Sequence, residues 1–304
     1  FHSIYHLLFL WFKLRHCELN QHAGHGPRVT KNWQMVSYYG YYQRKFAITP
    51  KKITMKTARE PTASAALVLD LFDGLNEFNL INSDDLQRLG ITREQLLHVE
   101  SRAPVSLIHK LWQCALEKKH PANIGLCIGQ RLNPLARGLL SHLISHTENM
   151  GDALALFRDK SGLMSEAEKV KFSIQGGVVK VQYTFINPDH YHKLAIERSF
   201  SAALTWVEQL TGKNIQPMEC GFRHKQVDYM AQCVEIFGDN ILFNQQQDYM
   251  LFDASLMTTP VLNRNLYLKE LLLKRAENVE HQMVSIAPLS KQVTNTIETH
   301  IAQG

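Results

Sequence analysis

The sequence predicts an α+β protein in which a helical N-terminal half is followed by an antiparallel sheet with packed helices. Three patterns indicate this class. Between Ala63 and residue 166, apolar residues recur every three or four positions, which is the period of one helix face. Beyond residue 166 the period changes to two, as in a half-buried strand. Strand and helix patterns then alternate as far as Pro260, which indicates an α+β unit built on one sheet.

The helical half is expected to hold five helices. The first begins near Ala63, where a polar start changes into an apolar periodic run. Thr92 and Gln95 have the spacing of a capping box and predict the start of a second, short helix. Pro104 suits the first position of a third helix, because proline has no N–H to leave unpaired there. The last two helices are expected over Ala136–Glu148 and Gly151–Met164.

The change of period marks a β-hairpin followed by a long helix. Apolar and polar residues alternate over 170–174 and again over 179–185, and Gly176-Gly177 lies between the two runs. A glycine pair between alternating runs is typical of a tight hairpin turn. The helical period then returns and continues to Gly212, which predicts a long helix closed by that glycine.

The segment from Ile215 to Pro260 is expected to form a strand, a helix that ends at a Phe-Gly pair, and two further strands. A leucine-rich helix is expected over 262–283, because one face stays apolar for about four turns. Pro288 interrupts that pattern, and a last helix is expected within 288–304.

The first 54 residues differ from the rest in charge. They carry eight lysines and arginines against one acid, whereas the other 250 residues carry 25 basic and 27 acidic groups. The formal net charge of +5 is therefore N-terminal, and the main body has no basic field of its own for attracting DNA. We interpret residues 1–54 as a basic, non-native or disordered extension, with translation starting near Met55.

The five cysteines are widely spaced, and no two of them form a CxxC motif. This spacing argues against a zinc knuckle or a disulfide framework, and it favours the reducing environment of the cytoplasm. The apolar run Ile4–Phe12 has nine residues, too few for a bilayer, which needs about 20 residues. We therefore expect a cytoplasmic protein with no membrane partner.

Several segments carry a family resemblance when they are taken in order. They are Arg102–Glu117, with its Pro-initiated helix; Ile124–Phe157, with Gly125, Leu126, Gly129, Gly138, Leu139, Ala153 and Leu154; Glu197 in the long helix; and Pro217, His224, Phe237, Gly238, Phe243, Leu256 and Pro260. In this order they resemble the regulatory region of AraC-type bacterial transcription regulators.

The resemblance implies an arabinose-binding-like regulatory region over residues 55–283, divided into a helical part (63–166), an α+β part (167–260) and a linker or dimerisation helix (262–283). It implies a small-molecule effector of unknown identity, and promoter DNA bound by a C-terminal helix-turn-helix domain. Residues 288–304 resemble only the first helix of that domain, which is therefore expected to be truncated. The alternative is a stand-alone small-molecule-binding α+β protein that does not bind DNA.

An effector pocket is expected between the sheet and the long helix, because a sensor needs a mainly apolar cavity with a few orienting polar groups. The candidate ligand-binding residues are Glu197, Arg198, Phe222, Arg223, His224 and Phe243. The same side chains have a simpler interpretation, in which Glu197 and His224 form structural hydrogen bonds within the fold.

The leucine-rich helix also has two interpretations. Its apolar face either packs on the sheet as core or contacts a second copy in a homodimer. The candidate dimerisation residues are Leu268, Leu272, Val279 and Met283.

Enzymatic and metal functions have little support in the sequence. There is no GxSxG elbow and no glycine-rich phosphate loop between a strand and a helix. His142 and His146 have the i, i+4 spacing of metal ligands but lack the glutamate of an HExxH motif. We therefore expect no enzyme, no catalytic residue, no bound metal and no cofactor.

Overall fold

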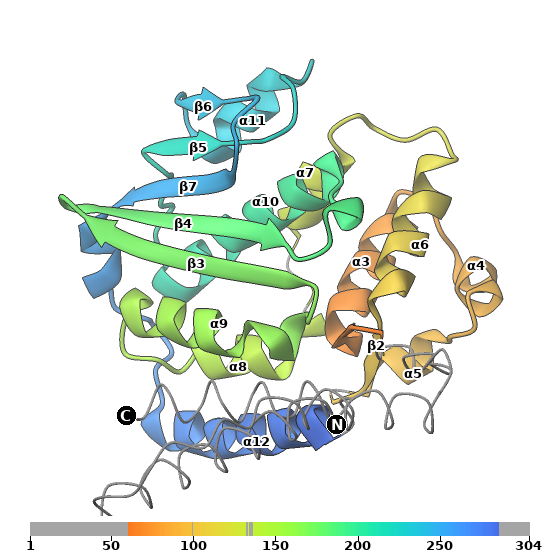
Figure 1. Ribbon diagram of the computed structural model, residues 1–304, viewed down its shortest axis with the longest axis horizontal. Helices are drawn as coiled ribbons and strands as arrows, with labels where there is room; N and C mark the ends of the chain where they lie inside the picture. The colour runs from red at the N-terminus through yellow and green to blue at the C-terminus, as the bar shows by residue number, and fades with distance from the viewer. Residues whose placement is uncertain (1–59, 99, 132, 134–135, 286–304) are drawn as a thin grey trace, which may run out of the picture. The chain divides into compact units, whose positions relative to one another are not determined.

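A computed structural model describes residues 60–98, 100–131, 133 and 136–285 (Figure 1). The chain divides into two units, Phe1–Thr57 and Ala58–Gly304, and all the described residues belong to the second unit. The predicted extension and the predicted helix within 288–304 lie outside the described residues. The α+β class is confirmed.

The helical part is built around one apolar core. This core collects the buried faces of α3, α6 and α7, with Leu69, Leu111 and Ile128 among its fully buried members. The capping box predicted at Thr92 and Gln95 is present and starts a short helix. The elements of this part are β1 (Thr62–Ser64), α3 (Ala65–Glu77), α4 (Ser83–Arg88), α5 (Arg93–Leu96), β2 (Arg102–Pro104), α6 (Val105–Leu116) and α7 (Ile124–Gly129).

A small ribbon within the helical part was not predicted. β1 and β2 pair antiparallel, with Ala63 opposite Ala103. Three-residue strands are too short to show a period of two, so the sequence pattern gives no signal for them. Pro104 ends β2 and is the residue before α6, so the prediction that it occupies the first helical position is wrong by one residue.

The next two helices are α8 (Leu139–Ile144) and α9 (Met150–Met164). The start of α9 agrees with the prediction to one residue, but α8 is shorter than the expected Ala136–Glu148. Hydroxyl groups at its C-terminal end explain the early stop, because Ser145 Oγ donates to the carbonyl of Ser141 and Thr147 Oγ1 donates to that of Ile144. Such local bonds compete with continuation of the helix.

The hairpin is confirmed as β3 (Glu168–Gln175) and β4 (Val178–Phe185). Gly176 and Gly177 form its turn with φ angles of 57° and 80°, a conformation that glycine adopts without strain. The full sheet has the order β3-β4-β7-β5-β6. The β5–β6 pair is parallel and the other pairs are antiparallel, so the sheet is mixed at one edge rather than wholly antiparallel.

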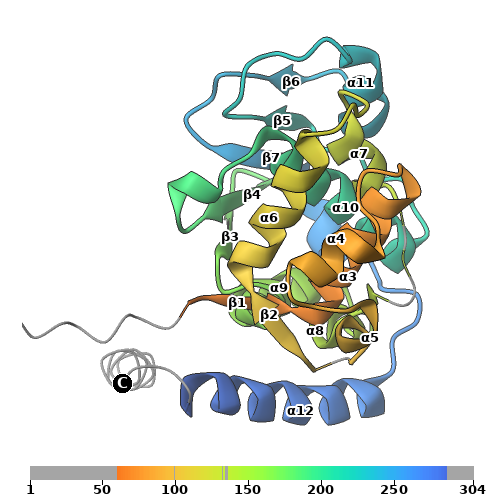
Figure 2. The same cartoon turned by 90° about the vertical axis from the view of Figure 1, so that its right-hand side faces the viewer.

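The remaining elements follow the predicted order. They are η2 (Pro188–His190), α10 (Lys193–Thr211), β5 (Glu219–Gly221), α11 (Met230–Phe237), β6 (Ile241–Leu242), β7 (Asp248–Asp253), η3 (Ala254–Thr258) and α12 (Leu266–Ser285). The leucine-rich helix thus begins four residues later than predicted. Figure 2 shows α12 beside α8, and the two helices are in contact.

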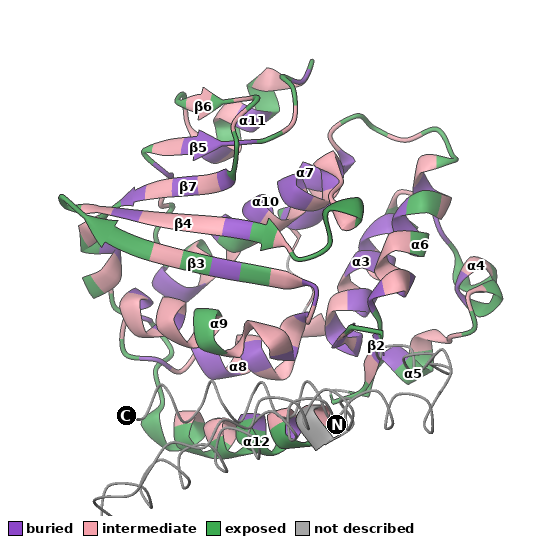
Figure 3. Ribbon diagram, in the orientation of Figure 1, coloured by how far each residue is buried: buried purple, intermediate pink, exposed green. Residues whose placement is uncertain are grey.

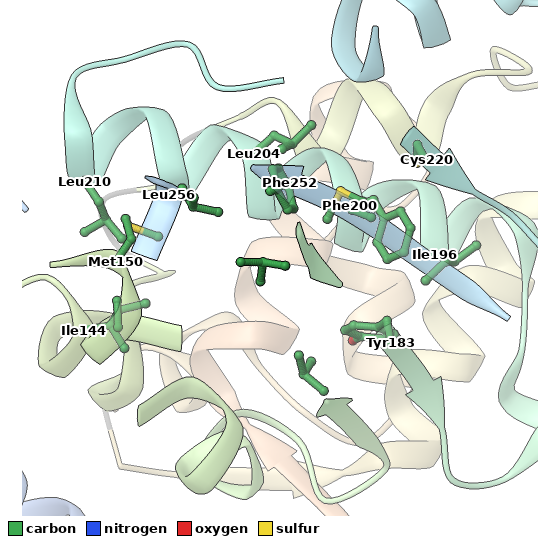
Figure 4. Close-up of a cluster of buried hydrophobic side chains, with 14 of the residues drawn as sticks. Ile144, Met150, Tyr183, Ile196, Phe200, Leu204, Leu210, Cys220, Phe252 and Leu256 are labelled. Carbon is green, nitrogen blue, oxygen red and sulfur yellow. The ribbon is translucent and has the colours of Figure 1, made fainter. Parts of the chain in front are cut away.

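The long helix α10 connects two cores. Its first turn places Leu194 in the helical core, and its later turns place Ile196, Phe200 and Leu204 in the core of the α+β part. The N-terminal half of α10 packs closely on α7, a short helix whose residues are mostly buried (Figure 3). Phe200 and Leu210 from α10, Tyr183 from the sheet, and Ile144 and Met150 from the α8–α9 layer surround one region of the α+β core (Figure 4).

His192, the residue immediately before α10, allows the N-terminal capping of this helix to be tested. The Nδ1 atom of His192 accepts a hydrogen bond of 3.2 Å from the backbone N–H of Leu194, so the imidazole acts as the N-cap. Replacing His192 with alanine removes the acceptor and is expected to lower the free energy of unfolding by about 1 kcal/mol. His192→Asn keeps a capping oxygen, loses the ring that stacks on Trp112, and is expected to be more stable than the alanine variant in urea unfolding. Equal stabilities of the two variants would contradict the capping role.

Candidate functional site

The α+β part contains a cavity of about 240 Å³. Its walls come from α10 on one side, from α8 and α9 on another, and from the inner face of β3, β4 and β7, with α3 closing one end. Most of the lining is apolar and includes Ile144, Met150, Phe157, Phe200 and Met250. A mainly apolar cavity with few polar groups is the usual form of a small-molecule site.

α9 and α10 provide the two helical walls because each turns only part of an apolar face towards the core. On α9, Leu154 and Phe157 are half-buried and line the cavity rather than fill it. On α10, Phe200 and Leu210 are buried, whereas Ala202 and Ala203 are small and leave room beside them.

The polar groups of the cavity belong to a row of ion pairs along α3. Asp70, Asp73 and Glu77 lie on one side of this otherwise apolar helix, and each binds an arginine from a different part of the chain. Arg198 of α10 donates to Asp70, Arg93 of α5 donates to Asp73, and Arg131 donates to Glu77. Of the three arginines, Arg131 and Arg198 line the cavity, and so does Asp70.

A second polar pair lies near Arg198. The hydroxyl of Tyr183 donates to the carboxyl of Glu168, and both residues line the cavity. Burial raises the pKa of Glu168 above its ordinary value, against the lowering effects of the Tyr183 hydrogen bond and the Arg198 charge. Burial likewise raises the pKa of Tyr183 well above 10. Both groups are therefore held towards their neutral forms.

Among the residues predicted to bind a ligand, Arg198 alone lines this cavity. Glu197 precedes it on α10, and because successive residues on a helix project about 100° apart, Glu197 faces a different part of the core. Its carboxylate accepts hydrogen bonds of 2.7 and 2.9 Å from the hydroxyl of Tyr229, and His224 Nε2 lies 3.6 Å away. Burial raises the pKa of Glu197 to about 7.

The other predicted side chains gather around Glu197 instead. The ring of Phe222 stacks on that of Phe243 with centroids 5.8 Å apart, and His224 lies 4.8 Å from Phe222. Burial lowers the pKa of His224 below its ordinary value. Arg223 is exposed, and its guanidinium lies over the ring of Tyr191 at 4.5 Å. Five of the six predicted residues thus form or border a cluster next to β5 and α11, and ligand binding by that cluster stays a prediction.

Sequence reasoning missed the cavity residues Asp70, Arg131, Glu168 and Tyr183. One signal was available in the spacing of Asp70, Asp73 and Glu77, which place three carboxylates on one side of a helix whose other residues are mostly apolar. The partners of these carboxylates are distant in sequence and give no local pattern.

The histidines with metal-ligand spacing lie apart from the cavity wall. His142 is half-buried, and His146 Nδ1 lies 2.9 Å from the carbonyl oxygen of Asn263. Within the described residues, no three His, Cys, Asp or Glu side chains are grouped so that they could hold a metal ion.

The candidate dimerisation residues of α12 divide into two sets. Val279 is buried in the core of the same chain, and Leu272 and Met283 pack against that core. Leu268 lies at the exposed side, close to Leu266, Tyr267 and Leu271, which are also exposed. Most of the predicted stripe therefore serves the core, and Val279 is not available to a second chain.

The described part of the chain is thus an α+β domain that encloses a mainly apolar cavity. Comparison with known families identifies it: residues 83–261 match the arabinose-binding domain of AraC transcription regulators, N-terminal region. The chain belongs to the AraC-type transcription regulators, and this segment is its effector-binding regulatory region. The family is one of transcription regulators rather than of enzymes.

Among solved structures, the chain resembles the crystal structure of the transcriptional regulator CdpR from Pseudomonas aeruginosa. The similarity covers 67% of this chain and 61% of that chain, with 14% sequence identity and a TM-score of 0.49. No curated protein gives a significant match. None of the helices in the described part of the chain is long and apolar enough to cross a bilayer.

Proposed function

We propose that this chain is the effector-sensing part of a DNA-binding transcription regulator, and that a small molecule bound in the 240 Å³ cavity controls an attached helix-turn-helix domain. The observation that carries the proposal is that the cavity lies within the family's effector-binding region, since its lining residues fall mostly between 83 and 261. A ligand shifts such a regulator only if it binds one conformation better than the other. A cavity enclosed by several helices and the sheet offers such a difference, because its volume depends on how they pack.

A cavity-filling variant tests the role of the site. Ala153 is buried on α9 and lines the cavity, so Ala153→Phe places an aromatic ring in the space a ligand would occupy. Ala231 is exposed on α11, and Ala231→Phe is the matched control for the same change in side chain. In the full-length gene product, we expect the Ala153 variant to keep its folded structure and lose the response of transcription to the inducing metabolite, while the Ala231 variant keeps both.

DNA binding is tested separately by gel-shift with the full-length product and DNA upstream of its own gene. A regulator is expected to give a sequence-selective complex that weakens steeply as salt is raised, because phosphate contacts release counterions. A full-length product that binds no DNA, while its cavity still binds a small molecule, would favour a stand-alone binding protein instead.

We further propose that the regulator is a homodimer and that the first two turns of α12 contact a second copy. The support is the group of exposed apolar side chains in these turns, at Leu266, Tyr267, Leu268 and Leu271.

Leu271→Asp is expected to convert the dimer to a monomer, as measured by light scattering on a sizing column, with little change in melting temperature. Ala276→Asp, on the buried side of the same helix, is expected to cost several kcal/mol because it places a charge in the core. A Leu271→Asp protein that remains dimeric would contradict this interface.

A further inference from the structure

Two buried hydrogen-bond donors in the cavity wall lack an acceptor within the described part of the chain, whereas the carboxyl acceptors of the wall have donors. Arg131 Nη1 and Arg198 Nε are buried and have no hydrogen-bond partner among the described residues. The half-buried carboxyl groups of the wall, in contrast, have donors: Asp70 accepts from Arg198, and Glu168 accepts from Tyr183. The unmet atoms of the wall are therefore donors, and a buried donor without an acceptor is costly.

The two arginines pair with different parts of α3. Their partners Asp70 and Glu77 are seven residues apart, which corresponds to about 10 Å along the helix axis at 1.5 Å per residue. Arg198 is the more buried of the two, with 11% of its side chain exposed against 22% for Arg131. Arg198 also lines both the large cavity and a smaller neighbouring cavity, so its guanidinium lies at an internal wall.

A guanidinium edge with an open N–H prefers a carboxylate, because the charge-assisted hydrogen bond is stronger than a neutral one. The nearby acids do not cancel that preference. Asp70 is already paired with Arg198, Glu168 accepts a hydrogen bond from Tyr183, and burial raises the pKa of Glu168. An incoming carboxylate would therefore meet the cationic guanidinium of Arg198 beside carboxyl groups that already have hydrogen-bond donors.

The lining of the rest of the cavity indicates that the remainder of the ligand is apolar. The walls away from Arg198 carry apolar side chains such as Leu140, Leu154, Val181 and Leu210. A cavity of about 240 Å³ corresponds to roughly eight waters at about 30 Å³ each, or a molecule of roughly ten heavy atoms.

We propose that the cavity binds a small amphiphilic monocarboxylate, with the carboxylate on the guanidinium of Arg198 and an unbranched or weakly branched apolar body between α9, α10 and the sheet. The inference deepens the proposed function, because it names the effector class of the same cavity. It distinguishes this chain from the sugar ligand in the family's description.

The probe is octanoate, which has ten heavy atoms, measured by isothermal titration against the full 304-residue chain and compared with 1-octanol, octylamine and L-arabinose. Octanoate is expected to bind, 1-octanol to bind at least tenfold more weakly, and octylamine and L-arabinose not to bind. Equal binding of octanol and octanoate, or binding of arabinose alone, would overturn the proposal.

A matched pair of arginine variants assigns the anchor. Arg198→Gln and Arg93→Gln each remove an arginine that pairs with an α3 carboxylate, but Arg93 donates to Asp73 through both Nε and Nη2 and does not line the cavity. The Arg198 variant is expected to bind octanoate at least tenfold more weakly than the Arg93 variant, and equal affinities would contradict the anchor. Arg198→Lys keeps a positive charge for Asp70 and replaces the glutamine variant if that variant does not fold. It too is expected to bind octanoate at least tenfold more weakly than the Arg93 variant.

The test of the ligand class can fail without the test of the proposed function failing, and the reverse also holds. If octanoate does not bind but Ala153→Phe still abolishes the transcriptional response, the ligand class is wrong and the effector site stands. If octanoate binds at Arg198 and Ala153→Phe leaves the transcriptional response intact, the ligand class stands and the sensing role is wrong.

Discussion

Replacing Gly129 with alanine is expected to destabilise the protein by about 3 kcal/mol or more, since severe overpacking against fixed atoms costs at least the usual 1–3 kcal/mol. Gly129 lies where α7 meets α10. A Cβ added there would lie 2.5 Å from the carbonyl oxygen of Arg198 and 2.9 Å from the backbone nitrogen of Ala202. Backbone atoms of a packed helix cannot move aside as a flexible side chain can, so the two helices would have to separate.

The matched control is Gly162→Ala on α9. No atom lies within 4 Å of the Cβ that this change adds, outside the neighbours of the helix itself. Alanine in a helix is preferred over glycine, so this variant is expected to be more stable than the parent by about 0.5–1 kcal/mol. Urea unfolding of both variants measures whether each change raises or lowers the free energy of unfolding. A Gly129→Ala protein as stable as the parent would show that α7 and α10 are not held at this separation.

Replacing Glu197 with glutamine is expected to change how the free energy of unfolding depends on pH. The side chain is 1% exposed, and burial raises its pKa from 4.5 to about 7. The folded protein therefore keeps a proton that the unfolded chain loses between these two values. The contribution of Glu197 to stability is largest below pH 4.5, falls as the pH rises through this window, and is constant above about pH 7.

At about 1.4 kcal/mol per pKa unit, the full change is on the order of 3 kcal/mol. Glutamine cannot ionise but still offers Tyr229 an acceptor. The stability of Glu197→Gln relative to the parent should therefore rise by about 3 kcal/mol between pH 4.5 and 7. The facing groups His224, Lys193 and Cys233 are present in both proteins, so their own titrations largely cancel in this difference.

The control is Glu208→Gln, which makes the same change at an exposed position of the same helix. Its stability relative to the parent is expected to change little over the same pH range in urea unfolding. Parallel pH profiles for the parent and Glu197→Gln would show that this carboxyl is not held in its neutral form by burial.

The sequence predicts this fold well where a local period is long. The hairpin at Gly176-Gly177 and the helix that ends before Gly212 each repeat one period over many residues. The β1–β2 ribbon and the parallel pairing of β5 with β6 involve three residues or fewer in each strand, and no period can develop over such a length.

The candidate site shows the same limit more clearly. The sequence predicts a ligand pocket between the sheet and the long helix, and Arg198 is the one predicted residue that lines the cavity described above. Glu197 was placed on the same wall, although the helix turns it towards Tyr229. Arg198 meets Asp70 across 128 positions of sequence, and only the tertiary fold, in which α7 contacts both α3 and α10, brings them together.

The position of α8 determines which part of the fold lies next to a molecule bound in the cavity. One side of α8 lines the cavity through Leu140 and Ile144, and α12 packs directly on the same helix. Packed helices lie about 8–10 Å apart, axis to axis. A single helix therefore separates the cavity from α12, so a molecule whose binding tilted α8 would act on α12 directly.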